Sequence, residues 1–161
     1  MFCFSFMLFL SRVSKLTLFV AAIALVVIAP AQLRAQRSEL EPAFSDFKGV
    51  RIGTSTEESR KKLGNPRDKG DDQDFYVFND TQAVQIFYDK TAKVSAISID
   101  YMTGASGIPS PKEVLGTEAD KKPDGSVYKL VRYPKAGYWV SYSRTAGDTP
   151  TTTVTMQKIE H

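Results

Sequence analysis

The chain has 161 residues, with 21 basic and 18 acidic side chains, and three of the basic residues (Arg12, Lys15 and Arg34) lie before Gln36. The chain from Gln36 onward therefore carries 18 charges of each sign, so no basic excess remains to argue for nucleic acid or an anionic membrane as a partner, and we expect neither. The single cysteine and the single histidine both lie within three residues of a terminus, which argues against imidazole-based triads and Cys/His zinc sites.

The N-terminal segment has the pattern of a secretory signal peptide. Arg12 and Lys15 precede a thirteen-residue run (16–28) that is apolar except for Thr17, and an Ala-Pro-Ala motif that ends at Ala31. This order is typical of an exported protein. We predict a signal peptide over 1–31, with an alternative cleavage after Ala35, and a mature protein in the periplasm or outside the cell. The other interpretation is an uncleaved leader that anchors the chain in the inner membrane, although a span needs about 20 apolar residues.

The next part of the chain predicts two helices followed by three strands. Apolar residues at helical spacing over 40–50 predict a short amphipathic helix. The segment Ser55–Leu63 begins with the spacing of a capping box and ends at Gly-Asn-Pro, which predicts a second helix. After a polar loop at 67–74, alternating β-branched and aromatic residues predict strands. These strands are Phe75–Phe78, Val84–Tyr88 and Val94–Tyr101.

The C-terminal part predicts one helix and three more strands. A connector at 102–109 contains two glycines and a serine and predicts a flexible link. Ser110-Pro111-Lys112-Glu113 is a capping box with proline at the first helical position, which predicts a one-turn helix up to Leu115. The strands predicted after it are Ser126–Arg132, Tyr138–Ser143 and Thr151–Ile159.

An internal repeat organises these elements. When the chain is shifted by 52 residues, six positions between Leu63 and Tyr76 are identical to positions between Leu115 and Tyr128. A match at a fixed period indicates two copies of one supersecondary unit. We therefore predict an α+β fold of two tandem αβββ units, one at 36–103 and one at 104–161, with helices packed on one face of antiparallel meander sheets. We expect Leu63 and Leu115, as equivalent positions, to be buried under the helices.

The aromatic residues of the two central strands are the best candidates for a binding site. Strand alternation places Phe87 and Trp139, which are 52 residues apart, on the face opposite the predicted helices. Gln85 and Ser141 are their polar neighbours on that face. Exposed aromatic rings of this kind dominate the energy of many interfaces. The alternative is that both rings are covered by other parts of the chain.

We predict no catalytic residues, no metal and no cofactor. The acidic loop Asp68, Asp71, Asp72 and Asp74 does not have the spacing, the central glycine or the closing glutamate of a calcium-binding loop. We interpret it as a solvated connection. Without an internal histidine or cysteine, an enzyme would have to use carboxylates, tyrosines or a Ser–Lys pair.

Several short motifs resemble a known signature. The runs IGTSTEES at 52–59, LGNP at 63–66, VQIFYD at 84–89 and KV at 93–94 are similar to the pattern GMT-x-x-E-V, LG-x-P, V-x-F-D and GKV. This pattern is found in the SmpA/OmlA (BamE) group and the β-lactamase inhibitory protein-like superfamily. The resemblance implies an exported, non-enzymatic domain that binds another protein. In the inhibitory protein the contact surface is a concave sheet rich in aromatic residues, to which Phe87 and Trp139 would correspond.

The sequence departs from this family in two places. Ser59 stands where the family usually has an apolar residue, and no lipobox cysteine follows the leader. The second departure argues against a BamE-like lipoprotein role. The functional hypothesis is therefore an exported, non-enzymatic protein-binding module of the cell envelope or extracellular space, whose partner and oligomeric state the sequence does not identify. The alternatives are a hydrolase or small-ligand-binding protein that uses carboxylates or tyrosines between the repeats, and a structural envelope component.

Overall fold

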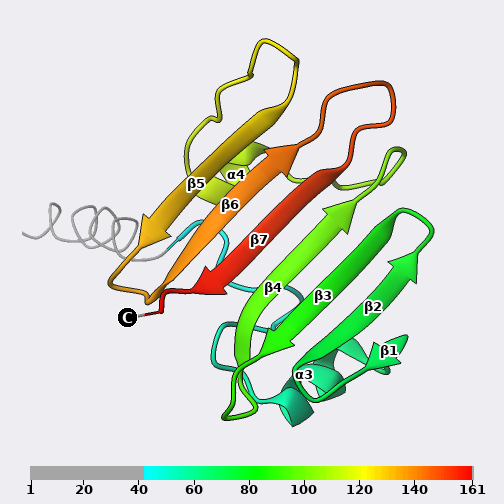
Figure 1. The fold of residues 1–161 in the computed structure, drawn as a ribbon, viewed down its shortest axis with the longest axis vertical. Helices are drawn as coiled ribbons and strands as arrows, with labels where there is room; N and C mark the ends of the chain where they lie inside the picture. The colour runs from blue at the N-terminus through cyan, green and yellow to red at the C-terminus, as the bar shows by residue number, and fades with distance from the viewer. Residues whose placement is uncertain (1–41, 161) are drawn as a thin grey trace, which may run out of the picture. The chain divides into compact units, whose positions relative to one another are not determined.

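A computed structural model of the chain describes residues 42–160. The signal peptide and both candidate cleavage sites lie outside these residues. Within the described part, seven strands form one antiparallel sheet in the order β1-β2-β3-β4-β7-β6-β5 (Figure 1). The strands are β1 (Asp68–Lys69), β2 (Gln73–Asn79), β3 (Gln82–Tyr88), β4 (Val94–Tyr101), β5 (Val127–Tyr133), β6 (Tyr138–Arg144) and β7 (Thr152–Lys158). The six strands β2 to β7 confirm the predicted strands to within about two residues at most ends.

The predicted fold of two tandem αβββ units was wrong. Within residues 42–160 the helices are only α3 (Thr56–Leu63) and α4 (Pro111–Leu115), of eight and five residues, so the domain is mostly one sheet. β4 pairs with β7 along its length, from Ala96 with Gln157 to Tyr101 with Thr152, which merges the two halves of the chain into that sheet. Periodicity and an internal repeat identify local elements, but they carry no information about which strand edges pair.

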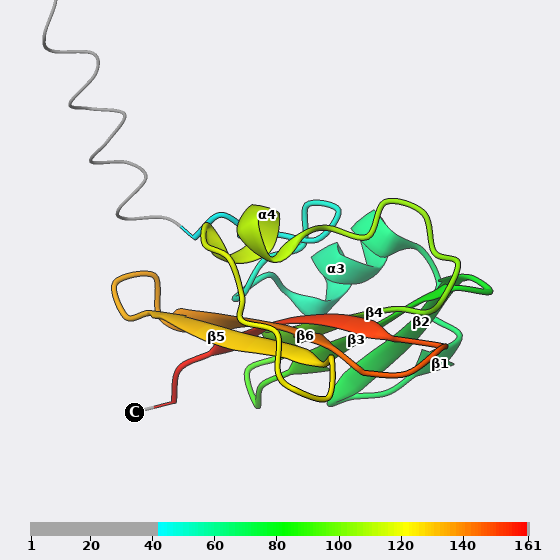
Figure 2. The same cartoon turned by 90° about the horizontal axis from the view of Figure 1, so that it is seen from above.

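The core lies between one face of the sheet and a thin cover. Figure 2 shows α3 and α4 on the same side of the sheet, together with the segment that begins at residue 42. Alternate residues of the central strands point to this side and are buried, because successive side chains of a strand point to opposite faces. They include Val84, Ile86 and Tyr88 of β3, Ile97 and Ile99 of β4, Val140 of β6, and Val154 and Met156 of β7.

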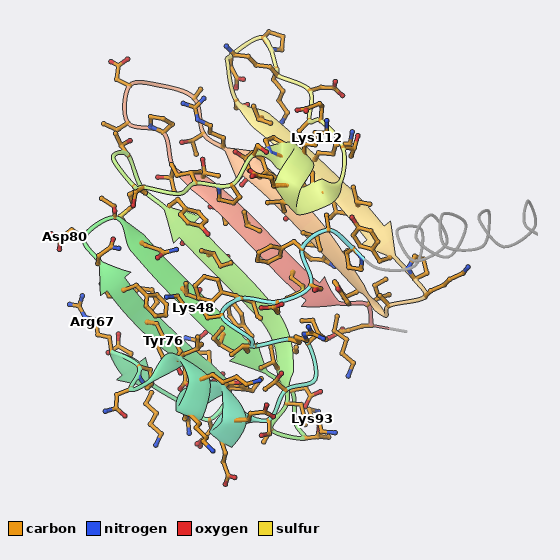
Figure 3. All side chains as sticks on the ribbon, turned by 180° about the vertical axis from the view of Figure 1, so that it is seen from behind. Lys48, Arg67, Tyr76, Asp80, Lys93 and Lys112 are labelled. Carbon is orange, nitrogen blue, oxygen red and sulfur yellow. The ribbon has the colours of Figure 1, made fainter. Side chains whose placement is uncertain are left out.

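The amphipathic helix predicted over 40–50 is not present in its described part. Phe47 and Val50 exchange backbone hydrogen bonds of 2.9 Å across a tight turn instead. Lys48 and Gly49 both have positive φ, at 49° and 80°, as a two-residue hairpin turn requires. The turn packs on the sheet, with the Lys48 ammonium 4.6 Å from the centre of the Phe78 ring (Figure 3). The glycine thus directs the chain into a turn where the apolar spacing indicated a helix.

The two helix starts were predicted with different success. In α4 the Ser110 side chain accepts from Glu113 N–H and the Glu113 carboxylate accepts from Ser110 N–H, which confirms the capping box. In α3 the Ser55 hydroxyl accepts from Glu58 N–H at 3.2 Å, but the Glu58 carboxylate pairs with Lys62 at 2.7 Å. A lysine one turn later thus competes for the carboxylate that a full capping box needs.

Candidate functional site

The sheet face opposite α3 and α4 is the candidate site, and we call it the open face. Figure 1 views the sheet from this side, with both helices behind the strands. Residues paired across neighbouring strands share a face. Phe87 pairs with Ala96, Ala96 with Gln157, and Gln157 with Trp139. These four side chains therefore form one row across the open face, which we call the aromatic row, and its rings are three strand spacings or about 14 Å apart.

The four site residues predicted from the sequence all lie on the open face. Phe87, Gln85 and Trp139 are half-buried, and Ser141 is buried at 8% exposure. Gln85 donates a long hydrogen bond of 3.4 Å to the Gln73 side chain of the neighbouring strand. Ser141 lies in the next row, between Thr155 of β7 and Leu130 of β5. The alternation of β3 and β6 thus sets the face of each residue, and their pairing through β4 and β7 places them in neighbouring rows.

The centre of the open face is polar and carries little charge. Ser98 of β4 and Thr155 of β7 share a hydrogen bond of 3.2 Å. The Thr153 hydroxyl donates to the Asp100 carboxylate at 2.7 Å. Both contacts link β4 to β7 at the junction of the two halves. Ala96 and Gln157 lie directly between the rings of the aromatic row, and the hydroxyl side chains lie in the neighbouring rows of β4 and β7.

Sequence reasoning missed other apolar residues on this face. Val77 of β2 is 42% exposed and Tyr128 of β5 is 51% exposed, and both share a row with Ala83, Asp100, Thr153 and Ser143. The repeat match had paired Tyr128 with Tyr76, which is buried at 2% exposure on the covered face. The two hairpins differ in register, because Tyr76 pairs with Val84 on the covered face whereas Tyr128 pairs with Ser143 on the open face. An odd shift in register moves a strand's side chains to the other face.

The covered face holds a buried charged cluster that sequence reasoning also missed. Asp74 of β2 is fully buried, and its carboxylate accepts two hydrogen bonds of 2.8 Å from the Arg60 guanidinium of α3. The Tyr88 hydroxyl donates to the same carboxylate at 2.7 Å and Gly70 N–H donates at 3.3 Å. Arg60 also donates to the Gly70 carbonyl at 2.7 Å. The cluster therefore fastens α3 and the 70–74 loop to the sheet.

The protonation states of this cluster suit a structural role. Burial alone would raise the pKa of Asp74, but the hydrogen bonds from Arg60, Tyr88 and Gly70 outweigh it and hold that pKa below its usual value. Burial, followed by the nearby Asp74 charge, raises the pKa of Tyr76 to about 12. Burial and the hydrogen bond to Asp74 also raise the pKa of Tyr88. Near neutral pH, Asp74 is thus an anion and both tyrosines keep their protons.

This cluster bears on the alternative hypothesis of carboxylate and tyrosine chemistry between the repeats. Asp74, Tyr76 and Tyr88 all come from the first half of the chain, and the oxygens of Asp74 are occupied by donors. The signal that places Asp74 here is its spacing of two from Tyr76, which puts both on one face of β2. Its place beside Asp71 and Asp72 in the sequence had suggested a loop residue instead.

The described residues offer no evident metal centre. Asp68, Asp71 and Asp72 are exposed, while Asp74 is occupied by Arg60. No group of three histidine, cysteine, aspartate or glutamate side chains within 42–160 is arranged to hold a metal ion. In the same range, no helix is both long and apolar enough to cross a bilayer.

Comparisons with known proteins place the chain in no family. No family model matches the sequence, and no curated protein matches it. Among solved structures it is similar to the crystal structure of a DUF4309 family protein (YjgB) from Bacillus subtilis. The two chains are 20% identical, the TM-score is 0.47, and the match covers 70% of this chain and 84% of the other. A similarity at this level carries no argument about function.

Proposed function

We propose that the protein is an exported, non-enzymatic binding module of the cell envelope or extracellular space, and that it holds a partner protein on the open face of its sheet. The observation that carries this proposal is the aromatic row, in which Phe87 and Trp139 share one face with Ala96 and Gln157 between them. Aromatic rings bury a large apolar area at a small cost in side-chain entropy, which makes them common anchors of interfaces.

The surroundings of the rings also support a protein partner. Small hydroxyl and amide side chains lie between and beside them, including Gln85, Ser98, Ser141 and Thr155. Such groups make hydrogen bonds without the desolvation cost of buried charges. Asp100, the charged side chain in the middle of the face, already accepts a hydrogen bond from Thr153. The resemblance to the BamE and inhibitory-protein group supports the same class of function.

Alanine substitution of the two rings tests the proposal. Capture of the partner from envelope extract or culture medium, measured by quantitative mass spectrometry, should identify a protein that the Phe87→Ala and Trp139→Ala variants retain poorly. We expect each substitution to weaken binding by about 2 kcal/mol or more, as for an interface anchor. Val77→Ala is the matched control, because Val77 is more exposed on the same face but lies outside the aromatic row. Its capture should fall by much less than that of the two ring variants.

Stability separates this proposal from a structural role of the rings. The two variants should melt within a few degrees of the unaltered protein, since each ring is half-exposed on the side away from the core. Normal capture by both variants would rule out the aromatic row as the interface. A loss of several kcal/mol of stability in both would instead assign the rings to packing.

Export has its own test. If residues 16–28 are the apolar region of a signal peptide, the mature chain should begin at Gln32 or Gln36. Intact-mass measurement of the protein from the periplasm or the medium of its native host checks this. An uncleaved chain in the inner membrane would replace export with anchoring.

A further inference from the structure

The outer edge of β5 has backbone groups without partners in the described chain. Lys122 N–H donates to the Ser126 carbonyl at 2.8 Å, so that carbonyl points away from β6. Backbone groups alternate in direction along a strand, so the N–H and C=O groups of Leu130 and Arg132 also point away from β6. The pairing of β5 with β6 leaves this edge outermost in the sheet (Figure 1). No backbone group of residues 42–160 bonds to Leu130 or Arg132 on that side.

The other end of this edge is already occupied. Lys121 forms an isolated antiparallel bridge with Val127, so the loop before β5 covers the first part of the strand. The free edge is therefore the short stretch from Leu130 to Arg132, which offers two N–H donors and two carbonyl acceptors. An edge of this kind is a template for an added strand.

Charge indicates what would pair there. Arg132 is exposed and forms no salt bridge with any residue of 42–160, and the same holds for Lys135 in the following turn. Lys121 and Lys122 lie beside the start of the strand together with Asp120 and Asp124, so the unbalanced charge near the free edge comes from Arg132 and Lys135. Antiparallel pairing of two copies over this edge would bring their two Arg132 side chains close together. It would also be too short for a stable dimer, which needs about 1,000 Å² or more. An acidic segment of another protein fits the edge better.

We propose that the Leu130–Arg132 edge of β5 binds an extended segment of a partner protein as an eighth antiparallel strand, with an acidic side chain of that segment beside Arg132. This inference rests on the proposed function, because it describes how the partner on the open face is held. Arg132 pairs with Trp139 across β5 and β6, so the added strand lies next to the end of the aromatic row. One partner thus reaches both the edge and the open face.

A short peptide provides the probe. In the blocked peptide Thr-Glu-Thr-Val-Thr, antiparallel pairing sets glutamate opposite Arg132 and valine opposite Leu130. Added at millimolar concentration to the ¹⁵N-labelled protein, it should shift the amide signals of Leu130 and Arg132 and slow their hydrogen exchange. The same peptide N-methylated at glutamate and valine lacks the donors that face β5, and it should leave these signals unchanged.

Charge reversal provides the matched variants. Arg132→Glu should weaken binding of the peptide on the order of tenfold or more, because two carboxylates then face each other. A peptide with lysine in place of glutamate should restore binding to that variant. Lys135→Glu makes the same charge change in the turn, away from the edge, and should alter the affinity by no more than about twofold.

Four results would overturn the inference. They are equal binding of the N-methylated peptide, peptide-induced shifts that avoid Leu130 and Arg132, a Leu130 amide already protected from exchange in the free protein, and Leu130 shifts that depend on protein concentration alone. The third would mean that the chain itself covers the edge, and the fourth that a second copy does. Failure of the peptide alongside loss of partner capture in Phe87→Ala would reject the edge and keep the proposed function. Peptide binding with normal capture in both ring variants would keep the edge as a strand-binding site and reject the aromatic row as the interface.

Discussion

Replacing Arg60 with alanine is expected to lower the free energy of unfolding by about 3 kcal/mol at neutral pH, the low end of the cost of removing one partner of a buried ion pair, because the Arg60 side chain is itself 25% exposed. The substitution leaves the Asp74 carboxylate fully buried without the two hydrogen bonds of 2.8 Å that the guanidinium donates. It also removes the hydrogen bond to the Gly70 carbonyl. Urea denaturation followed by the fluorescence of Trp139 measures the loss, since Trp139 is the only tryptophan of the chain.

Lys62→Ala is the matched control for this prediction. Lys62 lies on the same helix and pairs with Glu58 at 2.7 Å, but both side chains are exposed. Exposed pairs of this spacing contribute about 0.3–0.5 kcal/mol, and the hydrogen bond from Lys62 to the Gly49 carbonyl adds a similar small amount. The control should therefore lose no more than about 1 kcal/mol. Equal losses in both variants would show that the buried cluster contributes no more than a surface pair.

The dependence on pH gives a second check on the Arg60 variant. In the unaltered protein the pKa of Asp74 is lowered, so its stabilising effect is present above the unfolded pKa and is lost as the pH falls through the folded pKa. Without Arg60, burial should instead raise that pKa, and the cost should disappear as Asp74 becomes protonated. The difference between the two proteins should thus be largest near neutral pH and shrink as the pH approaches about 4. A difference that stays constant would point to lost packing rather than lost charge.

Individual helices and strands could be predicted from the sequence where a local pattern of residues determines the backbone conformation. β4 has the bounds that alternation predicted, Val94–Tyr101, and the capping box at Ser110 fixes the start of α4. The segment 40–50 failed because apolar spacing competes there with the turn at Lys48 and Gly49. Apolar periodicity indicates which side chains share a face, but a turn depends on residues that adopt a positive φ.

The overall fold was not accessible, because it depends on long-range pairing. The junction between β4 and β7 joins residues more than 50 positions apart, and neither strand carries a local signal for that partner. The repeat indicated two units, whereas the pairing within residues 42–160 produces one sheet accompanied by the short helices α3 and α4. The same limit explains Tyr128, whose face follows from the register of its hairpin with Ser143 and not from its match to Tyr76.

The candidate site could be predicted only in part, because part of it depends on which strands pair. Alternation within β3 and within β6 predicts the face of Phe87 and of Trp139, and this prediction does not depend on which strands pair. Their alignment in one row does need it, because the row runs through Ala96 and Gln157 of the two joining strands. Arg60 and Asp74 were missed because their contact spans a helix and a strand 14 residues apart.

Replacing Leu115 with alanine is expected to cost about 2–5 kcal/mol, the range for truncating a buried leucine. Leu115 ends α4 at 4% exposure, beside the fully buried Val114. Its sequence equivalent Leu63 ends α3 and is only half-buried, so Leu63→Ala should cost less, about 1–2 kcal/mol. The two variants form a matched pair, because residue type, helix position and the following glycine are the same.

This pair also tests whether the domain unfolds as one unit. α4 packs against β6 in the C-terminal half of the chain, while α3 is fastened to β2 and β3 in the N-terminal half by Arg60. Since β4 and β7 share one ladder, loss of either helix contact should lower the midpoint of a single transition, seen alike by Trp139 fluorescence and by far-ultraviolet circular dichroism. Two separate transitions in the Leu115→Ala variant would contradict unfolding of the domain as one unit. Equal losses of unfolding free energy at Leu63 and Leu115 would instead show that equivalent positions in the repeat contribute equally, whatever their burial.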